Sequence, residues 1–121
     1  MPSPPADAAP ARLTSAMLVS ALIRRVQAAG GFAAVLRRGD AHAGAVLIEC
    51  ADRGRRRLVL ERSTGFDGRD GWRTVAEPDG GDSAAQAERM DRRIKADPDL
   101  WIIELDIVDA ERFAAETISG G

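Results

Sequence analysis

Arginine is the residue type in this sequence whose number and spacing point most directly to binding chemistry. Sixteen of the seventeen cationic residues are arginines, and six of them fall into two short groups in the first half of the chain. A guanidinium group suits phosphate and carboxylate recognition, and a cluster of them can grip a phosphate backbone. The candidate anion-binding residues are Arg37, Arg38, Arg53, Arg55, Arg56 and Arg57.

Charge is distributed unevenly along the chain, and this leaves two interpretations open. Residues 12–73 carry twelve arginines and six acidic residues, whereas residues 74–121 carry five basic and twelve acidic residues, and the net charge is -2. The two halves could fold against each other and neutralise, or a basic face could meet an anionic partner. The arginine groups contain no aromatic residue for base stacking, which makes nucleic acid a possible but not a favoured partner.

Four carboxylates are expected near strand ends: Glu49, Glu61, Glu104 and Asp106. Such oxygen ligands could hold a divalent cation, and the order of a helix, three strands, a helix and a strand also occurs in metal-dependent nuclease cores. Those cores place a lysine two residues beyond a strand carboxylate, but that spacing from Glu49 and Glu61 reaches an alanine and a serine. The sequence therefore favours no catalytic residue, no metal and no cofactor, and solvated carboxylates with cross-strand arginine partners such as Arg57 and Arg62 are the preferred interpretation.

His42 is the sole imidazole and Cys50 the sole thiol of the chain. His42 falls in a turn rich in glycine and alanine, where a solvated side chain is expected. Cys50 falls in a strand, where it should behave as a small buried hydrophobe. A single cysteine excludes a disulfide within the chain and makes a structural zinc site implausible.

Periodicity predicts the elements that must position these residues. A helix begins after Thr14 or Ser15 and ends near residue 29, before two glycines. Strands are expected at residues 32–38, 45–50, 57–63 and 72–76, with a hairpin between the second and third. A second helix spans residues 83–95, with Ser83 and Gln86 forming a capping box, and its thin apolar stripe predicts a place on the rim. A strand at residues 100–108, apolar on both faces in its first half, and a short helix at residues 110–116 follow.

These elements predict a single α+β domain at residues 12–117, between a disordered tail at residues 1–11 and a flexible tail at residues 118–121. The domain is a mostly antiparallel sheet of about five strands, with an N-terminal helix, a second helix before the last strand and a short C-terminal helix. Too few helices are expected to cover both faces of the sheet. We therefore predict a homodimer, in which a second copy covers the other face.

The apolar stretch nearest the N-terminus is too short to cross a bilayer. It covers residues 13–23, and the two arginines that follow it argue against a secretory signal. The single cysteine fits a reducing compartment. A cytoplasmic location without membrane association is the expectation.

Three stretches together resemble a known bacterial family. They are the segment from Ala21 to Ala33 that ends a helix and passes two glycines, residues 37–47 with Arg-Arg-Gly-Asp and Ala-Gly-Ala-Val-Leu, and Asp97-Pro98-Asp99-Leu100-Trp101. The combination is similar to the family catalogued as domain of unknown function 1491, over residues 13–113. The resemblance implies a small standalone bacterial protein. It brings no activity, cofactor or functional residue.

Function is not defined by these residues, and three classes remain in order of preference. The first is a small non-enzymatic protein-interaction module of the bacterial cytosol, whose protein partner is unknown. The alternative is anion or nucleic-acid binding through the arginine-rich hairpin. A metal-dependent enzyme is the second alternative and has the least support.

Overall fold

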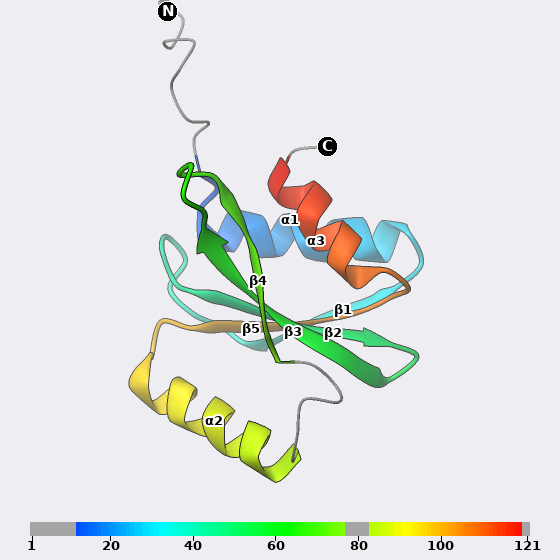
Figure 1. Cartoon of the computed structure of the whole chain (residues 1–121). Coiled ribbons are helices and arrows are strands. Elements are labelled where there is room, and N and C mark those ends of the chain that lie inside the picture. The colour runs from blue at the N-terminus through cyan, green and yellow to red at the C-terminus, as the bar shows by residue number, and fades with distance from the viewer. Residues whose placement is uncertain (1–11, 77–82, 120–121) are drawn as a thin grey trace, which may run out of the picture.

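A computed structural model describes residues 12–76 and 83–119, which form eight helices and strands (Figure 1). The α+β class predicted from the sequence is confirmed. Each predicted element exists, with ends shifted by a few residues, and the predicted tail at residues 1–11 lies outside the described residues. In chain order the elements are α1 (Ser15–Ala28), β1 (Phe32–Arg37), β2 (Val46–Asp52), β3 (Arg55–Thr64), β4 (Asp70–Ala76), α2 (Ser83–Ala96), β5 (Trp101–Asp106) and α3 (Ala110–Ser119).

The five strands form one sheet in the order β1-β5-β2-β3-β4. Three of the four neighbouring pairs are antiparallel, as expected, but β2 and β5 run parallel, so the sheet is mixed. The parallel pair arises because α2 carries the chain from β4 back across the sheet, as a crossover between parallel strands requires. In consequence β1 and β4 are the two edge strands.

Helix α1 forms as the sequence predicts because its apolar residues fall on one stripe. Thr14 is the N-cap, and its side chain accepts a hydrogen bond from the backbone N–H of Met17. Leu18, Leu22 and Val26 have no exposed surface. The helix ends before Gly30, whose φ of 87° is a left-handed conformation that glycine adopts without strain.

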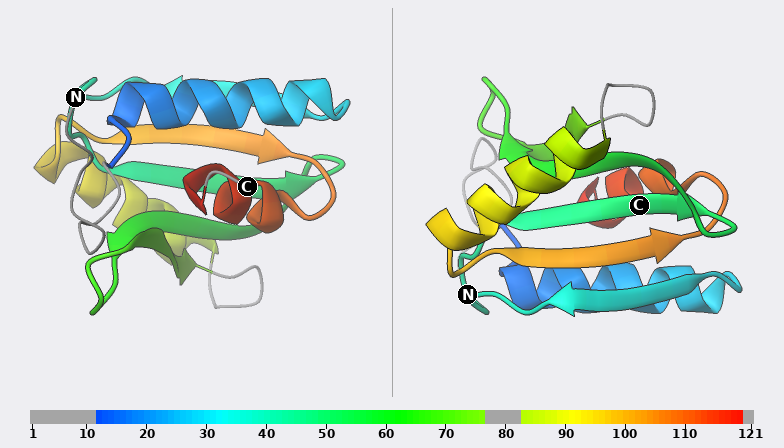
Figure 2. Two further views of the ribbon diagram at one scale, coloured as in Figure 1. Left: turned by 90° about the horizontal axis from the view of Figure 1, so that it is seen from above. Right: turned by 90° about the horizontal axis from the view of Figure 1, so that it is seen from below.

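Helices cover both faces of the sheet, which corrects the expectation that too few were available (Figure 2). α1 and α3 lie on one face, where thirteen buried residues form the larger apolar layer. α2 lies across the other face and not on the rim, because Met90 and Ile94 pack against a smaller buried group. That group is Leu47, Val59, Leu100 and Ile102.

The two tryptophans anchor the larger layer and are not part of an exposed binding surface. Trp101 is 4% exposed, and its indole N–H donates to the backbone oxygen of Asp40 at 2.7 Å. Trp72 is half-buried, and its indole N–H donates to the backbone oxygen of Ala114 in α3 at 2.9 Å. The indole N–H of each ring is therefore satisfied, whether the ring is buried, as in Trp101, or half-buried, as in Trp72.

Helix α3 is longer than the sequence suggested and includes two residues of the predicted C-terminal tail. It continues to Ser119, three residues beyond the expected end. Thr117 is buried with its hydroxyl donating to the Phe113 backbone oxygen, and Ile118 packs against the larger layer. None of the helices within residues 12–76 and 83–119 is both long and apolar enough to cross a membrane.

Candidate functional site

The arginine-rich hairpin is built around a two-residue turn at Arg53 and Gly54. Both residues have positive φ, at 54° and 80°, which is the conformation of a tight hairpin turn. Their backbone N–H groups donate to the two carboxylate oxygens of Asp106 on β5, each at 2.8 Å. Arg55, Arg56 and Arg57 belong to β3 and not to the turn, and the pairing of β2 with β3 is irregular there, because Leu58 lies opposite Cys50 and Arg56 opposite Ala51.

Only one of the hairpin arginines forms an ion pair within the part of the chain that the structure describes. Arg56 donates to Glu49 on the neighbouring strand at 2.7 Å. Arg53, Arg55 and Arg57 are exposed and have no carboxylate partner among those residues. The hairpin therefore presents three solvated guanidinium groups.

Arg37 and Arg38 lie at the opposite end of the sheet from this hairpin. Arg37 pairs with Ile102 at the start of β5, whereas the hairpin turn lies beside Asp106 at its end. Ile102 and Asp106 are four positions apart in β5, which corresponds to about 13 Å along the strand. The six candidate arginines consequently form two groups and not one surface.

Arg37 and Arg38 hold the chain together at their end of the sheet. A nitrogen of the Arg37 guanidinium donates to the backbone oxygens of Leu100 and Pro98, at 2.6 and 3.2 Å. The Arg38 guanidinium lies 5.8 Å from the centre of the Trp101 ring. Both side chains therefore have a structural role. That they also bind an anion remains a prediction.

The four candidate carboxylates do not converge on one position. Glu49 and Glu104 are partners on the parallel strands β2 and β5, but Glu49 is bound to Arg56. Asp106 is occupied by the hairpin turn. Within residues 12–76 and 83–119, no group of three or more histidine, cysteine or acidic side chains is placed to hold a metal ion.

Glu61 is the most buried of these carboxylates and is held by two arginines that differ from the predicted partners. Arg73 on β4 and Arg93 on α2 donate to its two oxygens at 2.8 and 2.7 Å. Burial acts to raise the pKa of Glu61, but the hydrogen bonds from the two arginines outweigh it, and the pKa lies below its usual value. The hydrogen bond between Glu61 and Arg93 in turn raises the pKa of Arg93. The three side chains of this cluster line an open groove of about 740 Å³ between α2, β3 and β4.

Cys50 is a core residue, as expected from its place in a strand. It is 1% exposed, and burial, with a smaller contribution from the charge of Glu111, raises the pKa of its thiol to about 12. A thiol in that state is a poor nucleophile. His42 is exposed in the loop between β1 and β2, as predicted.

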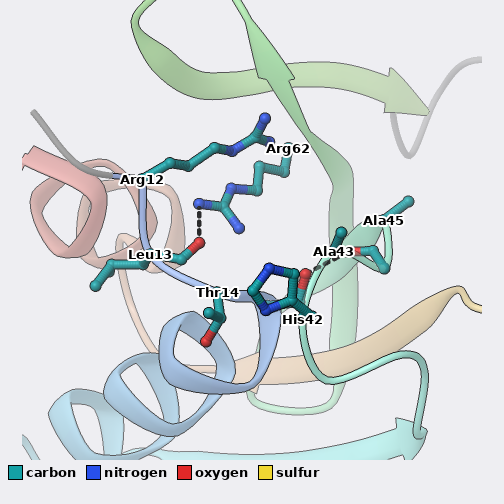
Figure 3. Close-up of a pocket in the computed structure, with 9 residues that line it drawn as sticks. Arg12, Leu13, Thr14, His42, Ala43, Ala45 and Arg62 are labelled. Atoms are coloured by element: carbon teal, nitrogen blue, oxygen red, sulfur yellow. Dashed lines mark hydrogen bonds between the residues drawn. The ribbon is translucent and has the colours of Figure 1, made fainter. Parts of the chain in front are cut away.

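A second cavity, which the sequence did not indicate, opens where α1 begins (Figure 3). Its volume is about 420 Å³, and its polar side chains include Arg12, His42 and Arg62. Arg62 follows Leu58 and Leu60 on the core-facing side of β3, and an arginine at such an alternating apolar position is the signal that could have revealed the cavity. Neither this cavity nor the groove is lined by Glu49, Glu104 or Asp106.

The edge strand β1 carries exposed apolar side chains. Phe32, Val35 and Leu36 are 58%, 44% and 53% exposed, and no charged residue lies between Phe32 and Leu36. Edge strands of soluble proteins are commonly protected by charge, proline or a covering element. Along its first five residues β1 has neither a charged residue nor a proline.

The sheet order and the helices on its two faces define a small mixed-sheet α+β domain. The chain belongs to the DUF1491 family, described as a protein of unknown function, whose sequence profile matches residues 13–115. The family resemblance noted from the sequence is thereby confirmed. A comparison with curated proteins found no match.

Solved structures of similar proteins share this fold. The chain is 33% identical to a DUF1491 family protein from Caulobacter crescentus, whose crystal structure aligns with a TM-score of 0.69 over 84% of this chain and 94% of that one. An NMR structure of a DUF1491 family protein from the same organism gives 33% identity and a TM-score of 0.66 over 85% and 93% of the two chains. A solution structure of a protein from A. tumefaciens gives 34% identity and a TM-score of 0.61 over 80% and 87%.

Proposed function

We propose that this protein is a small non-enzymatic interaction module of the bacterial cytosol that pairs with a second copy of itself through β1. The observation that carries the proposal is the uncharged, apolar and exposed edge formed by Phe32, Val35 and Leu36. An edge of this kind is a template for pairing with another strand. The lone buried thiol of Cys50 supports the cytosolic location, since it fits a reducing compartment.

The charges at the end of β1 favour a second copy in antiparallel orientation. Arg37 and Arg38 lie together at the C-terminal end of the strand, and Phe32 begins the other end. Antiparallel pairing of two identical strands places the arginines of one copy beside the phenylalanine end of its partner. Like charges then lie at opposite ends of the shared sheet, and the apolar side chains meet between them.

The oligomeric state in solution tests this proposal. The wild-type chain should have the mass of a dimer by light scattering, and Val35→Lys should reduce it to a monomer, because a charge on an edge strand opposes pairing. Val75→Lys is the matched control, since Val75 lies on the other edge strand, β4, and is similarly exposed at 41%. A wild-type monomer at all concentrations, or a dimer that tolerates Val35→Lys and not Val75→Lys, would contradict the proposal.

A second candidate function is anion or nucleic-acid binding through the hairpin. It is favoured by the three exposed guanidinium groups of Arg53, Arg55 and Arg57, which have no carboxylate partner within the described residues. Binding of mixed-sequence DNA or RNA should weaken as salt is raised and should be lost on reversing these three charges. Reversing the three exposed charges of Arg24, Arg89 and Arg92 on α1 and α2 changes the net charge by the same amount and is the control. Affinity that is independent of salt or of the hairpin charges would reject this function.

A further inference from the structure

Arg62 is a nearly buried cation with one edge of its guanidinium unused. Its side chain is 3% exposed. Nε and Nη2 donate to the carboxylate of Asp70, and Nη2 also donates to the backbone oxygen of Leu13 at 2.8 Å. Within the described part of the chain, Nη1 has no hydrogen-bond partner.

The unused Nη1 borders the cavity at the start of α1. Every fully buried side-chain nitrogen or oxygen among the described residues has a partner, so an unpartnered Nη1 must reach open space. Arg62 lines the 420 Å³ cavity, and Figure 3 shows its guanidinium directed toward the His42 ring. Strong donors of this kind require an acceptor, either water or a ligand.

Two arginine side chains border this cavity and share one carboxylate. Arg12 lies 3.5 Å from one oxygen of Asp70, and Arg62 binds both oxygens. No acidic residue is among those that line the cavity within the described part of the chain. An anion would therefore meet two arginines and an imidazole without a competing carboxylate on the wall.

The rest of the wall is fixed, which leaves a preformed space. The Asp40 carboxylate accepts hydrogen bonds from the backbone N–H groups of His42 and Ala43, at 3.2 and 2.9 Å. Gly44 packs so closely that an added Cβ would lie 2.2 Å from the backbone oxygen of Asp99. This glycine lets the loop pack against the segment that precedes β5, and the small side chains of Ala43 and Ala45 beside it leave the cavity unfilled.

The first turn of α1 does not supply the anion-binding groups. The backbone N–H groups of Ser15 and Ala16 already donate to the oxygens of His42 and Ala41, at 3.2 and 2.9 Å. The side chains from three separate segments remain as donors: Arg12 before α1, His42 in the loop after β1, and Arg62 on β3. Donors that approach from several directions match the several oxygens of a phosphate better than the planar carboxylate.

We propose that this cavity binds the phosphate group of a small phosphate monoester, held by Arg62, Arg12 and His42. The volume falls in the range of small-molecule sites, and Leu13, Ala43 and Ala45 form an apolar wall for the organic part of the ligand. The site is distinct from the β1 edge and from the arginine hairpin. It does not depend on either proposed function.

Binding of inorganic phosphate and phenyl phosphate, followed by NMR at constant ionic strength, tests the proposal. Both should produce saturable shifts in the amides of residues 13–16 and 42–45 and in the Nε–H of Arg62, and acetate should not. Arg12→Gln and His42→Asn should each weaken binding about tenfold, the loss expected for one hydrogen bond to a charged group. These two side chains lie at the rim, so neither variant removes the contacts of Arg62 with Asp70 and Leu13.

Arg57→Gln is the matched control, because it removes the same charge from the hairpin and should leave phosphate affinity unchanged. Arg62→Lys, checked for folding by circular dichroism, should abolish saturation because lysine cannot supply Nη1 while bound to Asp70. Equal shifts with acetate, the absence of saturation in the wild type, or full affinity in Arg12→Gln and His42→Asn would each overturn the proposal. Dimerisation through β1 is measured separately and is unaffected by any of these outcomes.

Discussion

At the scale of single residues, Glu61 shows how one carboxylate can couple three elements. It lies on β3 and accepts hydrogen bonds from Arg73 on β4 and Arg93 on α2. Its side chain is 12% exposed, whereas those of Arg73 and Arg93 are 65% and 36% exposed, so solvent screens the cationic side of the cluster. The contribution to stability is therefore modest in spite of the short distances.

Stability should depend on the ionisation of Glu61. Its pKa is lowered in the folded protein from a reference value of 4.5, so the stabilisation is complete above that pH and is lost as the pH falls through the folded-state pKa. Glu61→Gln should cost about 1 kcal/mol at neutral pH and flatten the acid side of the stability profile, measured by urea unfolding at several pH values. Glu116→Gln, at an exposed pair with Arg112 on α3, should leave the profile unchanged.

At the scale of elements, the β2–β3 hairpin depends on a side chain from another strand. Asp106 on β5 accepts hydrogen bonds from both residues of the turn, and both of these have positive φ. The turn contains Arg53 where a glycine or asparagine is usual, which disfavours the conformation. The carboxylate therefore compensates for an unfavourable turn residue.

Asp106→Ala should destabilise this hairpin specifically. Loss of two charge-assisted hydrogen bonds should cost about 2 kcal/mol, and hydrogen exchange at the amides of Arg53 and Gly54 should accelerate more than exchange elsewhere in β2 and β3. Asp52→Ala, which changes a neighbouring carboxylate without a hydrogen bond to the turn, is the control. Equal acceleration in both variants would show that Asp106 does not hold the turn.

At the scale of the whole molecule, the two faces of the sheet are unequally covered. Among residues 12–76 and 83–119, thirteen buried residues form the layer with α1 and α3, and four form the layer under α2. Met90 and Ile94, the apolar residues that join α2 to the sheet, are only half-buried. Burial of apolar surface therefore stabilises the packing of α2 on the sheet less than that of α1 and α3.

Native-state hydrogen exchange should reveal this inequality. The amides of α2 should exchange through openings of lower free energy than those of α1, because local stability follows buried apolar contact. Exchange measured by NMR at increasing urea concentrations resolves the two helices. Equal protection of α1 and α2, with the same dependence on urea, would contradict the two-layer description.

Much of this architecture follows from local sequence signals. The stripe of Leu18, Leu22 and Val26 predicted α1, and the double-sided apolar pattern of residues 100–103 predicted a covered strand. Position within the sheet could not be predicted, because periodicity fixes the faces of a strand but not its neighbours. For this reason the separation of Arg37 from the hairpin, at opposite ends of β5, could not be predicted from the sequence.

The sequence predicts neither that α2 covers the second face of the sheet nor that a cavity opens at the start of α1, and the reasons are related. The thin stripe of α2 suggested a rim position, but the sheet supplies most of the apolar surface in that contact. The sequence favours Arg62 as a partner of Glu49, Glu61, Glu104 or Asp106, whereas its partner in the structure is Asp70, the first residue of β4. Both outcomes depend on tertiary contacts between segments that are distant along the chain.

The place of β5 between β1 and β2 constrains how a nascent chain can fold. While residues 101–106 are still inside the ribosome, β1 with α1 and the β2–β3–β4 meander have no strand to join them. Their apolar faces then stay open to solvent and to chaperones. The sheet is complete only once a late-made strand lies between two early-made parts, and this non-local pairing should make folding slower than for a sheet whose neighbours follow one another in sequence.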